Sequence, residues 1–241
     1  RVVSEAMKIA TVDKDAKVGD PRFVDVPVVA LTSKDYASAC AERIRRGEKT
    51  RVPRFNAGGS ESKHTTHICV VDCDGNAVTM THTLGQPSGV ITEGLGFMYN
   101  GAMSVFDPRP GRAGSLEPGK ARFTALSPTI VFEGEKPFLV LGAPGATYIT
   151  MGNLQVMLNV MAFGMDAQQA VCAPRFAAVS DTIELSNRIL RATERGLQAE
   201  GYATSRHAQS FEFARVHAIR CVNGMLDGGA DPASGGMAVA T

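Results

Sequence analysis

The sequence has almost no excess of charge of either sign. Its 25 lysines and arginines are balanced by 24 aspartates and glutamates, which gives a formal net charge of +1. Proteins that bind nucleic acid or an anionic membrane through bulk electrostatics carry a clear basic excess. We therefore expect no nucleic-acid partner, and a small-molecule or peptide-like substrate fits the composition better.

Long hydrophobic runs and a paired set of cysteines are also missing. No stretch reaches the roughly 20 apolar residues of a membrane-spanning helix, so we expect no membrane span. The cysteines are odd in number and lack metal-finger spacing, which argues against a complete disulfide framework and against a zinc site. We interpret them as small buried side chains or free thiols: Cys40, Cys69, Cys73, Cys172 and Cys221.

The first residue is an arginine and not a methionine, and residues 1–12 already have apolar residues at helical spacing. No signal peptide is recognisable in this stretch, and we expect the natural amino terminus to lie upstream, which leaves the cellular compartment open. The chain has 241 residues, 44% of them hydrophobic, which is enough for one substantial core.

Residues 64–83 form the stretch around which the rest of the sequence is organised. Asp74-Gly75 is a strong two-residue turn signal, and the flanking runs are rich in Val, Ile and Thr, which predicts a β-hairpin. Thr65 begins one strand and Thr83 lies late in the other, so the turn brings the two hydroxyls towards each other. Most strand threonines are simply good β-formers, and such a pair becomes reactive only if a base deprotonates one of them.

Cleavage of the chain between His64 and Thr65 would supply that base. The freed α-amine of Thr65 has a reference pKa of about 8 and can accept the proton of its own hydroxyl. The preceding residues 56–63 are polar and contain glycine, so they predict an accessible linker in which a scissile bond can bend.

The remaining elements are predicted from periodicity, caps and turn residues. Ser33 is expected to cap a helix over 34–46, and Met151, Met157 and Met161 are expected to fill the core from a helix over 148–163. The other predicted elements are strands at 127–132, 138–141, 176–179, 211–219 and 237–239, helices at 166–172 and 187–200, and a turn at 228–232.

A glycine-containing turn at 142–147 connects a predicted strand to a predicted helix. Backbone N–H groups at such a helix start favour negative charge, so the turn could hold an anion or form an oxyanion hole. A tight strand-to-helix connection would need glycine in any case. The turn has no lysine at the position that a phosphate-binding loop requires.

Three separated motifs, in order, resemble the γ-glutamyltranspeptidase family. They are Gly-Asp-Pro-x-Phe within residues 19–37, Thr-Thr-His with Val-Val-Asp-x-Asp-Gly-Asn-Ala-Val and Thr-x-Thr in 65–83, and Pro-Gly-Ala at 144–146. The resemblance implies an α+β fold, the four-layer α-β-β-α sandwich of N-terminal-nucleophile hydrolases. It makes residues 1–64 the tail of the large subunit and residues 65–241 the whole small, catalytic subunit. The remainder of the large subunit is then a partner, and no cofactor is implied.

The resemblance also assigns catalytic roles by position. Thr65, released by self-cleavage after His64, would be the nucleophile, and the Thr83 hydroxyl would orient it. The N–H groups of Gly145 and Ala146 would form the oxyanion hole, although the family has a second glycine where this chain has Ala146.

The positions that bind the glutamyl group in the family differ here. Gly85 replaces an asparagine and Val105 an aspartate, both of which hold the α-ammonium in the family. Thr124-Ala125 replaces the Ser-Ser pair that binds the α-carboxylate. Asp107 lies two residues beyond Val105 and could take the place of the aspartate.

The predicted reaction is acyl transfer from a γ-glutamyl amide such as glutathione to water or an amine through an acyl-enzyme. Two alternatives stay open: an amidase or acylase of the same fold for a different acyl group, or an uncleaved, non-catalytic chain. His64, His67 and His82 could also be drawn as a metal site, but no carboxylate or cysteine completes a known ligand spacing. We therefore predict no metal.

Overall fold

The structure, a computed structural model, describes residues 1–53, 64–211 and 213–240. The predicted linker at 56–63 lies outside these residues. Among the described helices, none combines the length and the apolar character needed to cross a bilayer.

Strands β1 (Thr65–Val71) and β2 (Ala77–Thr83) form the predicted antiparallel hairpin. The Asp72 carboxylate closes the turn, because its Oδ1 accepts hydrogen bonds from the N–H groups of Asp74 at 3.0 Å and Asn76 at 2.8 Å. Thr65 pairs with Thr83 at the open end of the hairpin. The turn therefore fixes the register that puts the two threonines opposite each other.

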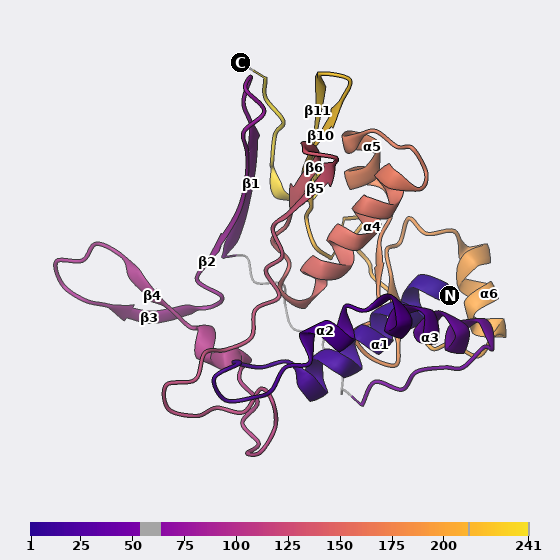
Figure 1. The fold of residues 1–241 in the computed structure, drawn as a ribbon, viewed down its shortest axis with the longest axis horizontal. Coiled ribbons are helices and arrows are strands. Elements are labelled where there is room, and N and C mark those ends of the chain that lie inside the picture. Colours follow the sequence, from indigo (N-terminus) through magenta and orange to yellow (C-terminus); the bar gives the residue numbers. More distant parts are fainter. Residues whose placement is uncertain (54–63, 212, 241) are drawn as a thin grey trace.

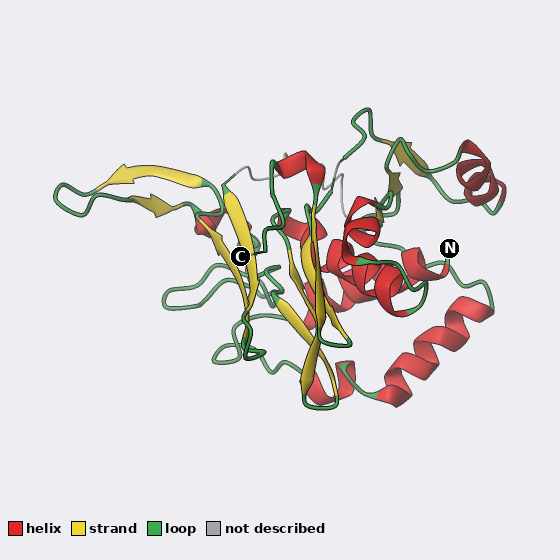
Figure 2. Cartoon of the chain, turned by 90° about the horizontal axis from the view of Figure 1, so that it is seen from above, coloured by secondary structure: helices red, strands yellow, loops and turns green. Residues whose placement is uncertain are grey.

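The hairpin packs against a four-stranded antiparallel sheet with the order β11-β10-β6-β5. Helices α4 and α5 cover the opposite face of that sheet, so that the hairpin, sheet and helices make three layers (Figure 2). The elements of these layers are β5 (Thr129–Glu133), β6 (Lys136–Gly142), β10 (His217–Val222), β11 (Met225–Ala230), α4 (Ile149–Met161) and α5 (Ala167–Cys172).

The main core lies between the sheet and these helices. Leu139 and Leu141 from β6 are fully buried against Ile149 and Val156 from α4. Leu139 and Leu141 lie two residues apart on one face of β6, and Ile149 and Val156 lie seven residues apart on one face of α4, so these side chains point to the same interior. This core supports the short turn that joins β6 to α4.

The remaining elements surround this centre. The arm formed by β3 and β4 extends away from the sheet, whereas α1 and α3 lie below α4 near the small unit that contains α6 (Figure 1). These elements are α1 (Val2–Lys17), α2 (Val28–Leu31), α3 (Lys34–Arg45), β3 (Pro87–Ile91), β4 (Met98–Asn100), β7 (Phe176–Ala177), β8 (Ile183–Leu185), α6 (Arg191–Ala199) and β9 (Thr204–Arg206), with 3-10 turns η1 (Ala102–Val105), η2 (Ala146–Tyr148) and η3 (Pro232–Ser234). Strands β7, β8 and β9 form one sheet, and Ser33 caps α3 as predicted.

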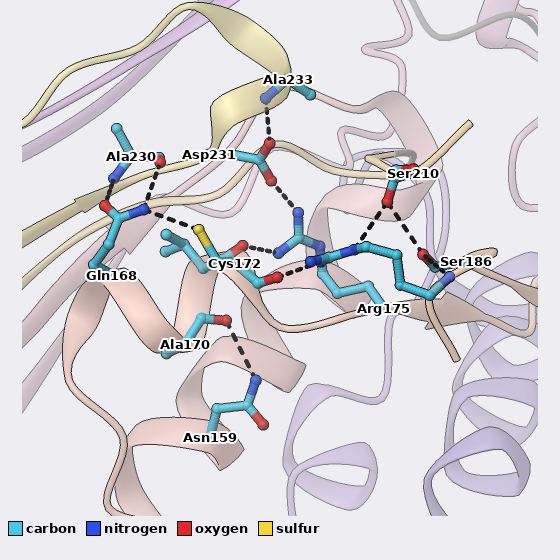
Figure 3. Close-up of polar contacts among 12 residues, drawn as sticks. Asn159, Gln168, Ala170, Cys172, Arg175, Ser186, Ser210, Ala230, Asp231 and Ala233 are labelled. Atoms are coloured by element: carbon cyan, nitrogen blue, oxygen red, sulfur yellow. Dashed lines mark hydrogen bonds and ion pairs between the residues drawn. The ribbon is translucent and has the colours of Figure 1, made fainter. Parts of the chain in front are cut away.

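A buried ion pair connects the segment after α5 to the segment after β11 (Figure 3). Arg175 donates from Nη2 to the Asp231 carboxylate and from Nη1 to the Val171 carbonyl at 2.6 Å, and Asp231 also accepts the N–H of Ala233 at 2.9 Å. Both side chains of the ion pair are buried. Removal of one partner would leave a buried charge without its counterion.

The last predicted strand and turn are wrong. Residues 228–230 belong to β11, whereas residues 237–239 form no strand. The actual turn lies at Asn223-Gly224, where both residues have positive φ, and this dipeptide is a strong hairpin signal. Met161 was also predicted to be buried, but it lies exposed at the last turn of α4, whereas Met151 is buried.

Candidate active site

The hydroxyls of Thr65 and Thr83 are in hydrogen-bond contact, with Oγ1 atoms 2.8 Å apart. Thr83 Oγ1 also accepts the N–H of Gly85 at 2.8 Å and donates to the His64 carbonyl oxygen at 3.3 Å. A consistent proton arrangement follows: Thr65 donates to Thr83, and Thr83 donates to His64. In this arrangement the Thr65 hydroxyl is the donor, and its oxygen keeps lone pairs with which it can act as a nucleophile.

The His64 carbonyl is the group that a cleavage before Thr65 would attack. Its oxygen accepts hydrogen bonds from two groups, the Thr83 hydroxyl at 3.3 Å and the Leu84 N–H at 3.4 Å. Donors at this oxygen favour the negative charge that develops on it during an attack on the carbonyl carbon. The predicted cleavage site therefore has a hydroxyl nucleophile and two oxyanion donors close to one peptide bond.

A row of polar side chains continues from this pair along the inner face of the hairpin. His67 Nδ1 lies 2.8 Å from Thr81 Oγ1, and His67 Nε2 lies 3.1 Å from Thr79 Oγ1 and 3.2 Å from Cys69 Sγ. Thr79 donates to the Leu141 carbonyl of β6 at 3.0 Å. The period-2 alternation of a strand puts all of these side chains on the face that also carries Thr65 and Thr83.

The imidazole of His67 is buried against β6. A Cβ atom built on Gly142 would lie 2.2 Å from His67 Cε1, so the ring occupies the space that a side chain at Gly142 would take. Burial lowers the pKa of His67 to about 4, and the nearby His217 ring contributes in the same direction. His67 is therefore neutral at neutral pH and acts as a hydrogen-bonding group inside the sandwich.

The three histidines of the hairpin do not share one site. His67 is on the inner face of the hairpin, whereas His82 is on the exposed outer face. Within the described residues, no cluster of three or more His, Cys, Asp or Glu side chains could hold a metal ion. The five cysteines are free thiols, and Cys73 is exposed and not buried.

The predicted oxyanion turn connects β6 to η2. Gly145 has φ 144° and Ala146 has φ 49°, so Ala146 is in the left-handed region that favours glycine. A Cβ atom on Gly145 would lie 2.6 Å from Ala214 Cα, and the Pro144 carbonyl accepts the N–H of Arg215 at 3.0 Å. The segment at 214–215 therefore holds the turn from one side.

Two of the predicted substrate positions, Gly85 and Val105, lie at the two ends of the segment that contains β3 and β4. Gly85 has φ 66°, and a Cβ atom there would contact Ala102, which belongs to the same 3-10 turn as Val105. In this structure Arg109 binds the Asp107 carboxylate through two bonds of 2.8 and 2.7 Å. The Arg109 guanidinium lowers the pKa of the Asp107 carboxyl to about 2.

Thr124 and Ala125 line a cavity of about 500 Å³ between α1 and α4. Thr124 Oγ1 accepts the N–H of Leu126 at 3.1 Å, and Lys14 lies over the ring of Phe123 at the same cavity. Apart from Lys14, the lining residues are apolar or carry a hydroxyl: Ala6, Met7, Ala10, Thr11, Phe123, Thr124, Ala125, Thr147, Thr150, Met151, Leu154 and Val179.

The sequence reasoning did not identify the hydrogen-bonded row of His67, Thr79 and Thr81 on the hairpin face that carries the candidate nucleophile. Once the turn at Asp74-Gly75 is accepted, the alternation of a strand assigns these residues to the face of Thr65 and Thr83. The contact of His67 with Gly142 could not be found in this way, because it joins two segments far apart in the sequence.

Comparisons with known proteins agree with this geometry. A family model described as gamma-glutamyltranspeptidase matches residues 1–241. The Acylase ACY 1 proenzyme of Pseudomonas sp. (strain SE83) is 37% identical over 209 residues, which cover 85% of this chain and 37% of that protein. The glutathione hydrolase proenzyme of Escherichia coli (strain K12) is 36% identical over 191 residues, covering 73% of this chain and 33% of that protein. The chain thus spans well under half the length of these relatives.

Solved structures match in the same way. A gamma-glutamyltranspeptidase from Pseudomonas nitroreducens complexed with L-DON is 33% identical, with a TM-score of 0.66, and the match covers 73% of this chain and 99% of that one. A cephalosporin acylase from Bacillus halodurans is 25% identical, with a TM-score of 0.79, over 95% of this chain and 42% of that one. These matches confirm the predicted α+β fold of the N-terminal-nucleophile hydrolases. Together with the family model, they show that the chain belongs to the gamma-glutamyltranspeptidase family.

Proposed function

We propose that this chain is the catalytic part of an amidohydrolase and acyltransferase that cleaves itself before Thr65 and then uses Thr65 as its nucleophile. The proposed substrates are γ-glutamyl amides such as glutathione. The observation that carries the proposal is the Thr65–Thr83 hydroxyl pair at 2.8 Å, with Thr83 bonded to the carbonyl of the bond to be cut.

Maturation would begin when Thr65 Oγ1 attacks the His64 carbonyl carbon and its proton passes to the departing Thr65 nitrogen. The peptide bond breaks as an ester forms between His64 and the Thr65 oxygen. Water then hydrolyses the ester, which gives the His64 carboxylate and frees the Thr65 hydroxyl and α-amine. The donors from Thr83 and Leu84 would stabilise the oxyanion of the first step.

In turnover, the α-amine of Thr65 would take the proton of its hydroxyl as the oxygen attacks the substrate amide. The N–H groups of Gly145 and Ala146 would stabilise the oxyanion. The amine product leaves with the transferred proton, and the acyl-enzyme then reacts with water or with an acceptor amine.

The proposed boundary between the two subunits agrees in size with one of the structural matches. Residues 65–241 are 177 of the 241 residues, about 73% of the chain, and the match to the Pseudomonas nitroreducens chain covers 73% of this chain. Residues 1–64 would then be the tail of the large subunit.

The proposed partner is the rest of that large subunit, and the outer face of the hairpin is its expected contact surface. This face is apolar and exposed, and cross-strand pairing places its residues together: Ile68 opposite Met80 and Val70 opposite Val78. Relatives that are more than twice as long as this chain contain additional residues that could cover it.

A second candidate function is hydrolysis of an acyl group that lacks the α-ammonium of glutamate. This alternative is favoured by the absence of a carboxylate at Val105 and by the engagement of Asp107 with Arg109. A buried ammonium without an anionic partner is costly, so the site described here would lose selectivity for γ-glutamyl over simpler acyl groups.

The test compares γ-glutamyl anilide with glutaryl anilide, which differs only in lacking the α-amino group. The protein is expressed from its complete gene, with Thr65→Ala as the control. Turnover of γ-glutamyl anilide that Thr65→Ala abolishes supports the first function, and a preference for glutaryl anilide supports the second. Turnover that survives Thr65→Ala contradicts both. A protein that turns over neither anilide and also stays uncleaved in its intact mass supports the non-catalytic alternative, whereas a cleaved protein that turns over neither points to another acyl group.

A further inference from the structure

A second group of titratable side chains lies behind the proposed oxyanion turn. The Tyr148 hydroxyl donates to the Glu184 carboxylate, 3.0 Å from Oε2 and 3.2 Å from Oε1. His207 Nε2 lies 2.9 Å from the same Oε2. Tyr148 is buried, and the side chains of Glu184 and His207 are largely shielded from solvent. This group is separate from the Thr65–Thr83 pair.

The aromatic ring of Phe213 packs between these residues. Its centroid is 5.4 Å from the ring of Tyr148 and 4.8 Å from the ring of His207, and both contacts are edge-on. Such contacts fix ring orientation in a packed interior. Phe213 has φ 75°, an unfavourable conformation for a bulky residue that persists only where the surrounding structure enforces it.

Tyr148 is also directly connected to the turn. It is the last residue of η2, which begins at Ala146, and its N–H donates to the Gly145 carbonyl at 3.0 Å. On the other side, Ala214 packs against Gly145, and the Arg215 N–H binds the Pro144 carbonyl. The turn is therefore held from two sides, by the segment after Phe213 and by the side chain of Tyr148.

We infer that Tyr148 is a positioning residue, and that its bond to Glu184, supported by His207, fixes the turn that presents the Gly145 and Ala146 N–H groups. This inference rests on the proposed function for the role of those N–H groups, but not for the bond itself. Oxyanion donors stabilise a transition state only when they are held in place before the reaction. A hydrogen bond to a carboxylate is stronger than one between neutral groups and suits this role.

The test replaces Tyr148 by phenylalanine, which removes the hydroxyl but keeps the ring against Phe213. Tyr202→Phe is the matched control, because Tyr202 is also a buried tyrosine but packs in the separate cluster with Leu197. For Tyr148→Phe we expect a kcat lowered by about 5- to 20-fold with KM changed less than about twofold, because the lost interaction acts in the transition state. Glu184→Gln, which keeps an acceptor oxygen for Tyr148, should retain more of the activity than Tyr148→Phe.

Amide hydrogen exchange of the peptide at 143–148 gives a readout that does not depend on activity. Exchange should be faster in Tyr148→Phe and unchanged in Tyr202→Phe. Exchange that is unchanged in Tyr148→Phe, or that is accelerated equally in both variants, would overturn the inference whatever the kcat. If the wild-type protein has no activity on either anilide while Tyr148→Phe still loosens the turn, the proposed function fails and the positioning role stands.

Discussion

Ala146 is the residue of the candidate site whose replacement gives the clearest expected change in stability. It has φ 49°, and its methyl group is exposed. A residue with a Cβ in the left-handed region costs roughly 1–2 kcal/mol, and glycine avoids this cost. Glycine instead loses about 0.5–1 kcal/mol through its greater freedom in the unfolded chain. Ala146→Gly should therefore raise the free energy of unfolding by about 0.5–1 kcal/mol.

The assay is denaturant unfolding of the wild type and the variant, followed by a thermal scan. For a chain of this size, the expected change corresponds to an increase in Tm of about 1–4 °C. Ala143→Gly is the matched control, because Ala143 is in the same turn but is fully buried and has no positive φ. The control should lose about 1–2 kcal/mol, since it gives up a buried methyl group and gains chain entropy in the unfolded state.

A second readout follows from the proposed role of the turn. If the left-handed conformation of Ala146 is the one that the oxyanion hole needs, glycine adopts it without strain and kcat should stay within about twofold of the wild type. The reasoning would be refuted if Ala146→Gly were as destabilising as Ala143→Gly, because Ala146 would then carry no backbone strain.

Three further predictions follow from the described contacts. Thr83→Val removes the hydroxyl but keeps the shape of the side chain, so self-cleavage should slow by about 10- to 100-fold, whereas Thr83→Ser should retain most of the rate. Equal cleavage rates for the two variants, measured in a time course of intact mass, would contradict the role of the hydroxyl. The pKa of His67 is lowered to about 4 in the folded protein, so between about pH 6.5 and 4 the unfolded chain binds a proton that the folded chain does not. The free energy of unfolding should therefore fall by up to about 3 kcal/mol as the pH drops through this window. His67→Asn should flatten that part of the pH profile of urea unfolding, whereas exposed His82→Asn should not, and identical profiles for the two variants would contradict the assignment. Asp231→Asn should lower the free energy of unfolding by about 3–5 kcal/mol, because Arg175 would stay buried without its counterion. The double variant Arg175→Met with Asp231→Leu should recover much of that loss in urea unfolding, and a double variant as unstable as the single one would argue against a charge effect.

The sequence was most informative where local rules decide the structure. Asp74-Gly75 determines the turn, the turn determines the register, and the register brings Thr65 opposite Thr83. The same kind of reasoning placed β6 and the helix that follows it. Applied to Asn223-Gly224, it would also have located the turn between β10 and β11, which was predicted five residues too late.

Contacts between distant segments could not be derived from local pattern. Tyr148 and Glu184 are 36 residues apart, and the bond between them depends on how β8 packs behind the turn. The pairing of Asp107 with Arg109 is local, yet resemblance to the family suggested a different use for Asp107. Burial of Met161 was predicted wrongly because helical periodicity does not tell which turn of a helix extends beyond the core.

The most direct test of the central claim is the intact mass of the protein expressed from its complete gene, combined with amino-terminal sequencing of each fragment. We predict two fragments, one of which begins Thr65-Thr66-His67, and a single uncleaved chain for Thr65→Ala. An uncleaved wild-type chain, or a fragment with any other amino terminus, would contradict the proposal that Thr65 is an N-terminal nucleophile.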